Sequence, residues 1–295
     1  MYKIFTFIIL FISFSSAIAD HPILIMTYVH SRPDFIELHK KTFKAFLQND
    51  YEYIVFNDAP SESMRKQIEQ TCNNLSIQHF RVPQHLHIHG RTSPGHRHMD
   101  AIKYSLEVAG YKHDGIVVMI DADMFLVKPL NIIEYMQEYN FIGGYQDRTK
   151  GNIKVIYTSP CLTFMNMRTL PNKDTISFEG GYIHGLACDV GAHTYYYFKN
   201  NPTINLYLYT AVSKDNLCNL SNTELQALGY DTNTIDFLAA VDRRYGFEFH
   251  GDTYFIHYYA GGSNWPGYSS TYLQEKNNLL NNYINQQIET YKNEK

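Results

Sequence analysis

Two aspartates follow a short apolar run in the middle of the chain, in the stretch 115–130, GIVVMIDADMFLVKPL. The run 116–120 is too short for an ordinary helix and predicts a strand that is buried on both faces of a sheet. Asp121 and Asp123 come after it with only Ala122 between them, so strand alternation sends both carboxylates to the same side. Like charges this close are unfavourable unless a cation or a shared proton lies between them. The stretch therefore predicts a site for Mn²⁺ or Mg²⁺ that leaves positions open for substrate phosphates; a solvated strand end is the alternative.

The first 19 residues have the form of a signal peptide. Lys3 precedes an apolar run at 4–14, and Ala17 and Ala19 mark a cleavage site before Asp20. The run is short for a membrane span, and a short N-terminal signal anchor is the alternative. We therefore expect a protein of the secretory pathway, or an exported one, with no stable membrane span after cleavage. Residues 20–295 are expected to form one domain.

The charge balance argues against nucleic acid as a partner, and the cysteine spacing argues against a structural zinc site. Lys3 is the only charged residue of the leader, so the remainder carries 24 Lys and Arg against 29 Asp and Glu. Without a basic excess, nucleic acid is not expected as a partner. The four cysteines are widely spaced and form no Cys-x-x-Cys pair, which argues against a structural zinc site and leaves one or two disulfides open. They are Cys72, Cys161, Cys188 and Cys218.

Strand-like and helix-like segments alternate in the first half of the chain. Residues 23–28 predict a strand, 33–47 a helix and 53–56 a second strand; a helix at 63–71, capped by Ser61 or Ser63, and a strand at 76–82 follow. This order predicts an α/β fold with a Rossmann-like, mostly parallel central sheet and flanking helices. Ligands of such sheets bind at the carboxyl ends of the strands. Beside the two aspartates, the polar residues at these ends are Thr27, Tyr28, His30, Arg32 and Asp58.

The connection 83–98 is rich in histidine and precedes a predicted helix at 99–109. Alternate histidines at 85, 87 and 89 would share one face of a strand, so a zinc site is conceivable there. No acidic residue or cysteine repeats at ligand spacing, which favours a histidine-rich loop on the substrate side. Arg91, Arg97 and Asp100 lie in the same stretch, and an arginine there is a plausible clamp for a diphosphate.

The second half contains weaker patterns. We expect a helix at 129–139, a strand at 140–145, and two strands at 154–157 and 162–165 that are separated by a break at Ser159-Pro160. The glycine-rich stretch 178–192 contains Asp189, which is expected to open an aromatic helix that ends near Pro202. Asp189 is either an ordinary helix cap or part of a pocket wall.

The last third adds one candidate ligand. Residues 253–259 predict a strand that contains His257, just before a glycine turn and the only tryptophan, Trp265. A histidine inside an apolar strand is either a satisfied core residue or a ligand. The stretch 272–295 predicts a C-terminal helix, at about 272–291, that packs on the domain.

Three stretches resemble the GT-A superfamily of nucleotide-sugar glycosyltransferases, and within it the glycogenin-like retaining branch. The stretch MIDADMFLVKPLNII is similar to the Asp-x-Asp segment of that branch. The stretch SPCLTFMNM occupies the place of the strand that follows, and keeps its Asn-Ser-Gly signature only in part. The stretch FIHYYAGGSNW is similar to the late metal-ligand segment, with its histidine, aromatic residue and glycine.

The resemblance implies a metal site and a donor site. Asp121, Asp123 and His257 would be ligands of a Mn²⁺ ion that holds the donor diphosphate, and Asp189 would lie near the reacting sugar as the catalytic candidate. Where the family has Lys-Pro before the tryptophan, this chain has Ser263-Asn264, so Arg91 or Arg97 would have to replace the missing lysine. The residues expected to contact the donor are Thr27, Tyr28, Arg32, Asp58, Arg97, Asp100, Asp121, Ala122 and Trp265.

The expected function is that of a metal-dependent, hexosyltransferase-like glycosyltransferase. It would move a sugar from a nucleotide-diphosphate donor to a hydroxyl of a glycan, protein or lipid acceptor. One alternative is a phosphatase of the haloacid dehalogenase type, which also has a strand followed by Asp-x-Asp, but near the start of its domain. Another is a secreted carbohydrate-binding protein without turnover, for which the 25 tyrosines and 18 phenylalanines would suit sugar stacking.

Overall fold

The computed structural model describes residues 22–87, 94–240, 247–258 and 269–295, with the side chains of 214 and 215 left out. The predicted leader, Arg91, Ser263, Asn264 and Trp265 lie outside the described residues. None of the helices in the described ranges combines the length and apolarity that a membrane span requires.

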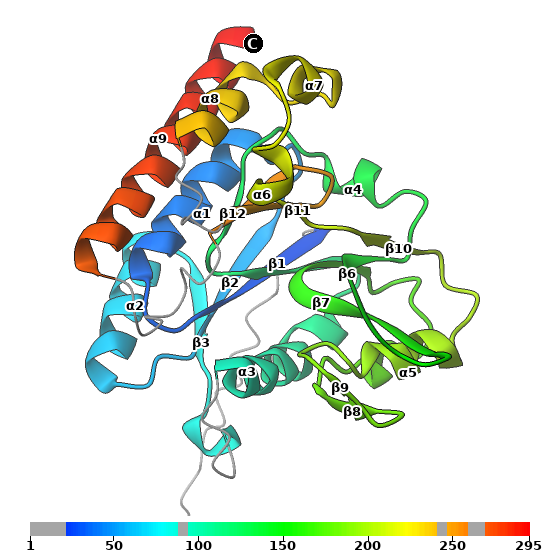
Figure 1. The fold of residues 1–295 in the computed structure, drawn as a ribbon. Coiled ribbons are helices and arrows are strands. Elements are labelled where there is room, and N and C mark those ends of the chain that lie inside the picture. Colours follow the sequence, from blue (N-terminus) through cyan, green and yellow to red (C-terminus); the bar gives the residue numbers. More distant parts are fainter. Residues whose placement is uncertain (1–21, 88–93, 241–246, 259–268) are drawn as a thin grey trace, which may run out of the picture.

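A seven-stranded sheet forms the centre of the molecule (Figure 1), in the order β10-β6-β7-β4-β1-β2-β3. Strands β3, β2, β1 and β4 are parallel to one another, and β10 is parallel to β6. Strand β7 runs antiparallel to both of its neighbours, β4 and β6. The strands are β1 (Ile23–Val29), β2 (Glu52–Asn57), β3 (Gln78–Arg81), β4 (Ile116–Asp121), β6 (Phe141–Lys150), β7 (Ile153–Asn166) and β10 (Leu206–Tyr209). The predicted α/β fold with a mostly parallel sheet is confirmed.

Helices cover both faces of this sheet, because the strand residues alternate between two hydrophobic cores. Ile23 and Ile25 of β1 pack in the core under α1, α2 and α9, whereas Leu24 and Met26 pack in the core against α3 and α5. Figure 1 shows the two groups of helices on opposite sides of the sheet. Their bounds are α1 (Pro33–Phe46), α2 (Glu62–Asn74), α3 (Pro94–Val108), α5 (Thr194–Asn200) and α9 (Ser270–Glu294).

A second, four-stranded sheet joins the last third of the chain to the centre, in the order β11-β12-β13-β5. Its strands are antiparallel, with β5 (Met124–Leu126) at one edge, then β13 (Phe255–Tyr258), β12 (Phe247–His250) and β11 (Val212–Ser213). Only two residues, Ala122 and Asp123, separate the end of β4 from the start of β5, so this small sheet extends from the carboxyl edge of the large one.

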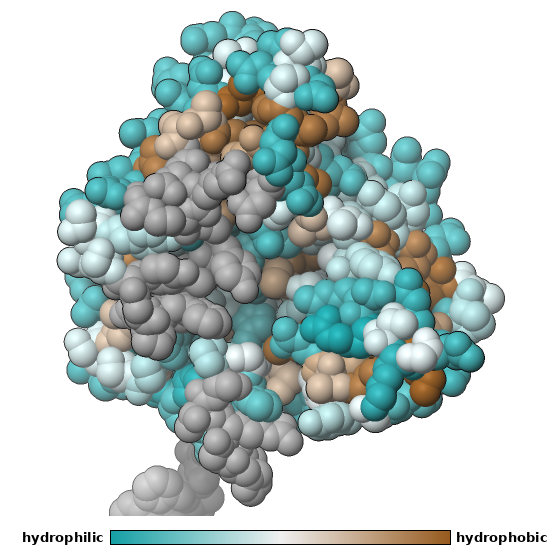
Figure 2. Space-filling view, in the orientation of Figure 1, coloured by the Kyte–Doolittle hydropathy of each residue, from teal (hydrophilic) through white to brown (hydrophobic). Residues whose placement is uncertain are grey.

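The remaining elements are short and lie at the periphery. Figure 2 shows hydrophobic residues gathered over α7 and α8, at the top of the view, and a recess near the middle of this face. The short peripheral elements are α4 (Ile132–Tyr135), α6 (Lys214–Leu217), α7 (Asn222–Ala227), α8 (Thr232–Ala240), β8 (Gly181–Ile183), β9 (Leu186–Cys188) and the 3-10 turns at Gln84–Leu86, Gly110–Lys112 and Lys173–Thr175.

Two predictions on the strand and helix pattern are wrong. The break expected at Ser159-Pro160 is a bulge within the continuous strand β7, where the register to β6 shifts between Gly143 and Gly144. A bulge tolerates a proline, which has no N–H to donate. The helix expected at 129–139 shrinks to α4, because Leu130 instead forms a bridge with Leu47 and Asn131 caps the helix that follows.

The expectation for Asp189 also differs from the structure, and the sequence leaves the pairing of the cysteines open. Asp189 does not open a helix: it lies in a turn, and α5 begins only at Thr194. All four cysteines are free, so the disulfides that the sequence left open are absent from the structure.

Candidate metal centre and ligand cavity

The two aspartates lie where the large sheet passes into the small one. Strand β4 ends at Asp121, which is half-buried, and Asp123 is 7% exposed just before β5. Strand β13 pairs with β5 in a register that sets His257 opposite Met124, the residue after Asp123. Asp121, Asp123 and His257 each offer a ligand atom within 4.8 Å of the other two. Residues more than 130 positions apart in the sequence thus form one possible metal site.

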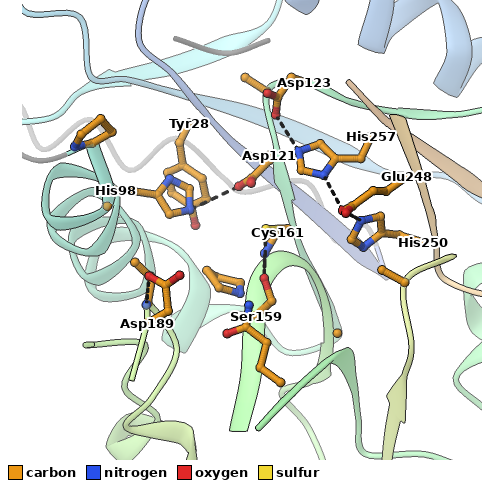
Figure 3. A pocket seen from close by; sticks show the side chains of 18 of the residues that line it. Tyr28, His98, Asp121, Asp123, Ser159, Cys161, Asp189, Glu248, His250 and His257 are labelled. Atoms are coloured by element: carbon orange, nitrogen blue, oxygen red, sulfur yellow. Dashed lines mark hydrogen bonds and ion pairs between the residues drawn. The ribbon is translucent and has the colours of Figure 1, made fainter. Parts of the chain in front are cut away.

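His257 lies among carboxylates on both sides of its ring. Its Nε2 is 3.4 Å from Asp123 Oδ1, and its Nδ1 is 3.7 Å from Glu248 Oε2 (Figure 3). Burial by itself would lower the pKa of His257, but Asp123, Glu248 and Asp121 raise that pKa to about 10. In the metal-free protein the ring therefore carries a proton at neutral pH, and a metal ion would have to displace that proton.

A second set of possible ligands shares His257. Glu248 and His250 of β12 combine with His257, again with ligand atoms within 4.8 Å of one another. The β12–β13 register sets Glu248 directly opposite His257, and His250 Nε2 lies 3.3 Å from Glu248 Oε2. Hydrogen bonds from His250 and His257 hold the pKa of Glu248 well below its usual range. Glu248 and His250 were not predicted from the sequence, although their spacing of two in FEFH is the signal that places both on one strand face.

Two histidines of the 83–98 connection, His87 and His98, pair with separate carboxylates. His98 Nε2 lies 3.2 Å from Asp121 Oδ1, and its ring meets the Tyr28 ring edge-on, with centroids 5.1 Å apart. His87 lies between two other carboxylates, 2.7 Å from Asp58 and 3.2 Å from Asp100. The described histidines of this loop therefore extend the acidic edge of the sheet and do not gather into a zinc site of their own.

Arg97 is held at the end of β2. Its Nη2 donates to Asp58 Oδ1 at 2.9 Å, to the Asp58 carbonyl oxygen at 2.9 Å and to Gln84 Oε1 at 3.3 Å. Among the residues that the structure describes, Arg97 is the one arginine or lysine that lines the cavity beside the aspartates.

A cavity of about 630 Å³ lies over the carboxyl edge of the sheet. One wall comes from the strand ends and α3, and the other from β6, β7 and the turn that contains Asp189 (Figure 3). The lining includes Tyr28, Asp58, Arg97, His98, Asp121, Ala122, Asp123, Tyr145, Ser159, Asp189, Glu248, His250 and His257. A cavity of this size falls in the range of ligand sites.

Asp189 reaches the far wall because its turn lies directly against β7. A Cβ at Gly191 would lie 1.9 Å from the Thr158 carbonyl oxygen, and Gly191 has a φ of +96°. Only glycine fits such a close approach in this conformation. One oxygen of Asp189 accepts the Val190 N–H at 2.8 Å, which leaves the carboxylate exposed at the cavity.

Three other residues expected at the donor site, Thr27, Arg32 and Asp100, lie elsewhere. Thr27 is completely buried and does not line the cavity. Arg32 forms an ion pair with Asp34 and stacks 3.7 Å over the Phe35 ring at the start of α1. Asp100 is bound to His87 and does not line the cavity.

Comparisons with known proteins give distant structural matches. No protein-family model matches the chain, and no curated protein matches its sequence. A mannosyltransferase from Pyrobaculum calidifontis, in complex with GDP-mannose and Mn²⁺, aligns over 64% of this chain and 55% of its own, with 12% identity and a TM-score of 0.41. The bifunctional glycosyltransferase WbbM aligns over 54% of this chain and 34% of its own, with 11% identity and a TM-score of 0.36.

A third match is the glucosyl-3-phosphoglycerate synthase from Mycobacterium tuberculosis, in complex with Mn²⁺, UDP and glucosyl-3-phosphoglycerate. It aligns over 42% of this chain and 43% of its own, with 16% identity and a TM-score of 0.31. This chain thus spans about half or less of the length of each of the three solved chains.

Proposed function

We propose that this protein is a metal-dependent glycosyltransferase of the GT-A type, which moves a sugar from a nucleotide-diphosphate donor to an acceptor hydroxyl. The observation that carries the proposal is the convergence of Asp121, Asp123 and His257 at the carboxyl edge of a mostly parallel sheet, beside a large cavity. Ligands of open α/β sheets bind at this edge. The acceptor is a glycan, a protein or a lipid, and the transfer is of the hexosyltransferase kind.

The ligand set suits Mn²⁺. Two carboxylates and one imidazole match the preference of this ion for oxygen and nitrogen ligands. Asp121 Oδ1 is shielded from solvent and accepts no well-aligned hydrogen bond within the described ranges, although His98 Nε2 is nearby. A bound ion would supply Lewis-acid stabilisation of the negative charge on the leaving diphosphate.

The protein's own side chains would bind and orient the donor. Arg97 presents its guanidinium at the cavity wall, where it would replace the lysine that the glycogenin-like branch has before its tryptophan and that this chain lacks. Asp189 faces the metal ligands from the far wall, where a carboxylate would lie beside the sugar of a donor held at the metal. Positioning of the acceptor hydroxyl against the sugar would supply a further part of the rate enhancement.

The remaining parts of the proposal rest on sequence. The three segments around Asp121, Ser159 and His257 support the glycogenin-like, retaining branch. The form of residues 1–19 supports a protein of the secretory pathway or an exported one.

The test is hydrolysis and transfer with a panel of nucleotide sugars and Mn²⁺. We expect turnover of at least one donor, loss of turnover on chelation, and a decrease of about 10²–10³-fold or more for Asp123→Asn. The matched control is Asp252→Asn, because Asp252 accepts hydrogen bonds from Tyr135 and Tyr207 and does not line the cavity.

Two outcomes would contradict the proposal. If the wild type and Asp123→Asn hydrolyse every donor equally slowly while donors still bind, the protein is a carbohydrate- or nucleotide-binding protein. Phosphatase activity that survives His257→Ala would favour the haloacid dehalogenase type, although three strand–helix units (β1–α1, β2–α2 and β3–α3) precede Asp121 here.

A further inference from the structure

We propose that Glu248, His250 and His257 form a second metal site, which prefers Zn²⁺ and competes with the aspartate site for His257. The site lies on the small antiparallel sheet and opens into the same cavity. Only the competition rests on the proposed glycosyltransferase function, since the zinc site itself follows from the geometry of β12 and β13.

The strand register brings the three side chains together. Glu248 faces His257 across the β12–β13 pair, and His250 follows Glu248 on the same face of β12. Figure 3 shows the Glu248 carboxylate between the two imidazole rings. Its Oε2 is 3.3 Å from His250 Nε2 and 3.7 Å from His257 Nδ1. A tetrahedral zinc with bonds of about 2.0–2.1 Å separates its ligands by about 3.3 Å, so both measured distances are close to the edges of such a tetrahedron.

The surroundings also suit zinc. His250 and His257 are each 6% exposed, which keeps both ligands in fixed orientations. Glu248 is more exposed than the two histidines and lines the cavity with them, so a fourth position is open from the cavity side. Three protein ligands with one open position are a common zinc arrangement. Two imidazoles in the set favour Zn²⁺ over Mn²⁺, whereas the pair of aspartates favours the harder ion.

The two sites are mutually exclusive because they use opposite nitrogens of one ring. His257 Nε2 faces Asp123, and Nδ1 faces Glu248. A neutral imidazole has one free lone pair, and its other nitrogen carries the proton. Zinc at Nδ1 therefore leaves an N–H pointing at Asp123, which removes the nitrogen ligand from the aspartate site. Manganese at Nε2 in turn leaves an N–H that donates to Glu248.

The test is calorimetric titration of the metal-free, full-length protein with Zn²⁺ in the absence of any nucleotide. We expect one Zn²⁺ per chain, an affinity at least tenfold weaker for His250→Ala, and an affinity within about threefold of wild type for Asp121→Asn. Bound Zn²⁺ is expected to weaken Mn²⁺ binding at least tenfold in the wild type. The matched control is His193→Ala, because His193 forms a similar pair with Glu179, at 3.5 Å, away from the cavity lining.

The inference is overturned if the wild type binds no Zn²⁺, if His250→Ala binds it as tightly as wild type, or if Asp121→Asn weakens it equally. If His250→Ala does not fold, Glu248→Gln decides, since it keeps the side-chain shape and removes the carboxylate. The titration contains no donor, so a failure of the glycosyltransferase proposal leaves its result unchanged. Conversely, Mn²⁺-dependent transfer without zinc binding would contradict this inference alone.

Discussion

His39 and His257 both lie against strand β5 at Met124, one from helix α1 and the other from strand β13. Both are buried, with exposed fractions of 0% and 6%. Their charges nevertheless differ, because burial lowers the pKa of His39 to about 4, whereas the carboxylates around His257 raise its pKa to about 10. The comparison separates a histidine that supports the fold from one that belongs to the site.

His39 has the partners of a neutral ring. Its Nε2 is 2.7 Å from the Met124 carbonyl oxygen, which can only accept, so this nitrogen carries the proton. Its Nδ1 then accepts from the Tyr53 hydroxyl at 2.8 Å, and the rings of Phe43 and Phe125 pack around it. Every polar atom of this ring is satisfied within the core, and the ring fixes the start of β5 beneath the two aspartates.

His257 differs because three carboxylates lie within reach of one ring. Asp123 and Asp121 come from the β4–β5 junction, and Glu248 comes from the neighbouring strand. Burial therefore does not decide the charge of a histidine here; the number of carboxylates around the ring does. A divalent ion can replace the proton that His257 holds among them.

The largest expected effect is on Mn²⁺ binding and donor turnover, when each histidine in turn is replaced by glutamine. We expect His257→Gln to weaken Mn²⁺ binding and donor turnover by about 10²–10³-fold, because a metal ligand is lost. His39→Gln is the matched control and should leave the Mn²⁺ affinity within about threefold. Calorimetric Mn²⁺ titration with donor assays makes the measurement. Equal losses in the two variants would show that His257 acts only through the fold.

A somewhat smaller effect is expected on the free energy of unfolding as the pH falls from 7 to 4. The pKa of His39 is about 4 in the folded state and near 6.5 in an unfolded chain, so protons bind the unfolded chain first. The contribution of neutral His39 to the free energy of unfolding is therefore complete above pH 6.5. It is lost as the pH falls toward 4, by about 3 kcal/mol in total.

Urea unfolding of wild type and His39→Phe at pH 7, 6, 5 and 4 tests this acid effect. We expect the variant to be less stable at pH 7 and the difference to shrink toward pH 4, since phenylalanine cannot be protonated. A constant difference over this range would mean that His39 does not titrate as its burial requires.

The sequence predicted the parallel part of the sheet well, because its signals are local. The apolar runs that became β1, β2 and β4 are each bounded by turn or capping residues, and the Asp-x-Asp pair lies directly behind one of them. His257 was found from a similar apolar strand before a glycine turn. Thus short stretches of sequence were enough to predict these strands and to name Asp121, Asp123 and His257 as candidate ligands.

Glu248 and His250 were not predicted, because their role depends on a pairing between strands. Strand β12 has only four residues, FEFH, and this pattern alone does not tell which strand it pairs with or in which register. A shift of one residue would send Glu248 to the opposite face. The bulge in β7 was missed for a similar reason, since Ser159-Pro160 predicts a break equally well.

The smallest expected effect is on the free energy of unfolding when the hydrogen bond that keeps His39 neutral is removed. Tyr53→Phe removes the hydroxyl that donates to His39 Nδ1 and leaves a buried acceptor unpaired, so we expect the free energy of unfolding to fall by about 1–2 kcal/mol at pH 7. Tyr51→Phe is the control, because Tyr51 meets the same Phe43 ring and is only partly buried. Urea unfolding at pH 7 measures both variants. A loss in Tyr51→Phe as large as that in Tyr53→Phe would assign the effect to the removal of a tyrosine hydroxyl beside Phe43 in general and not to the hydrogen bond that keeps His39 neutral.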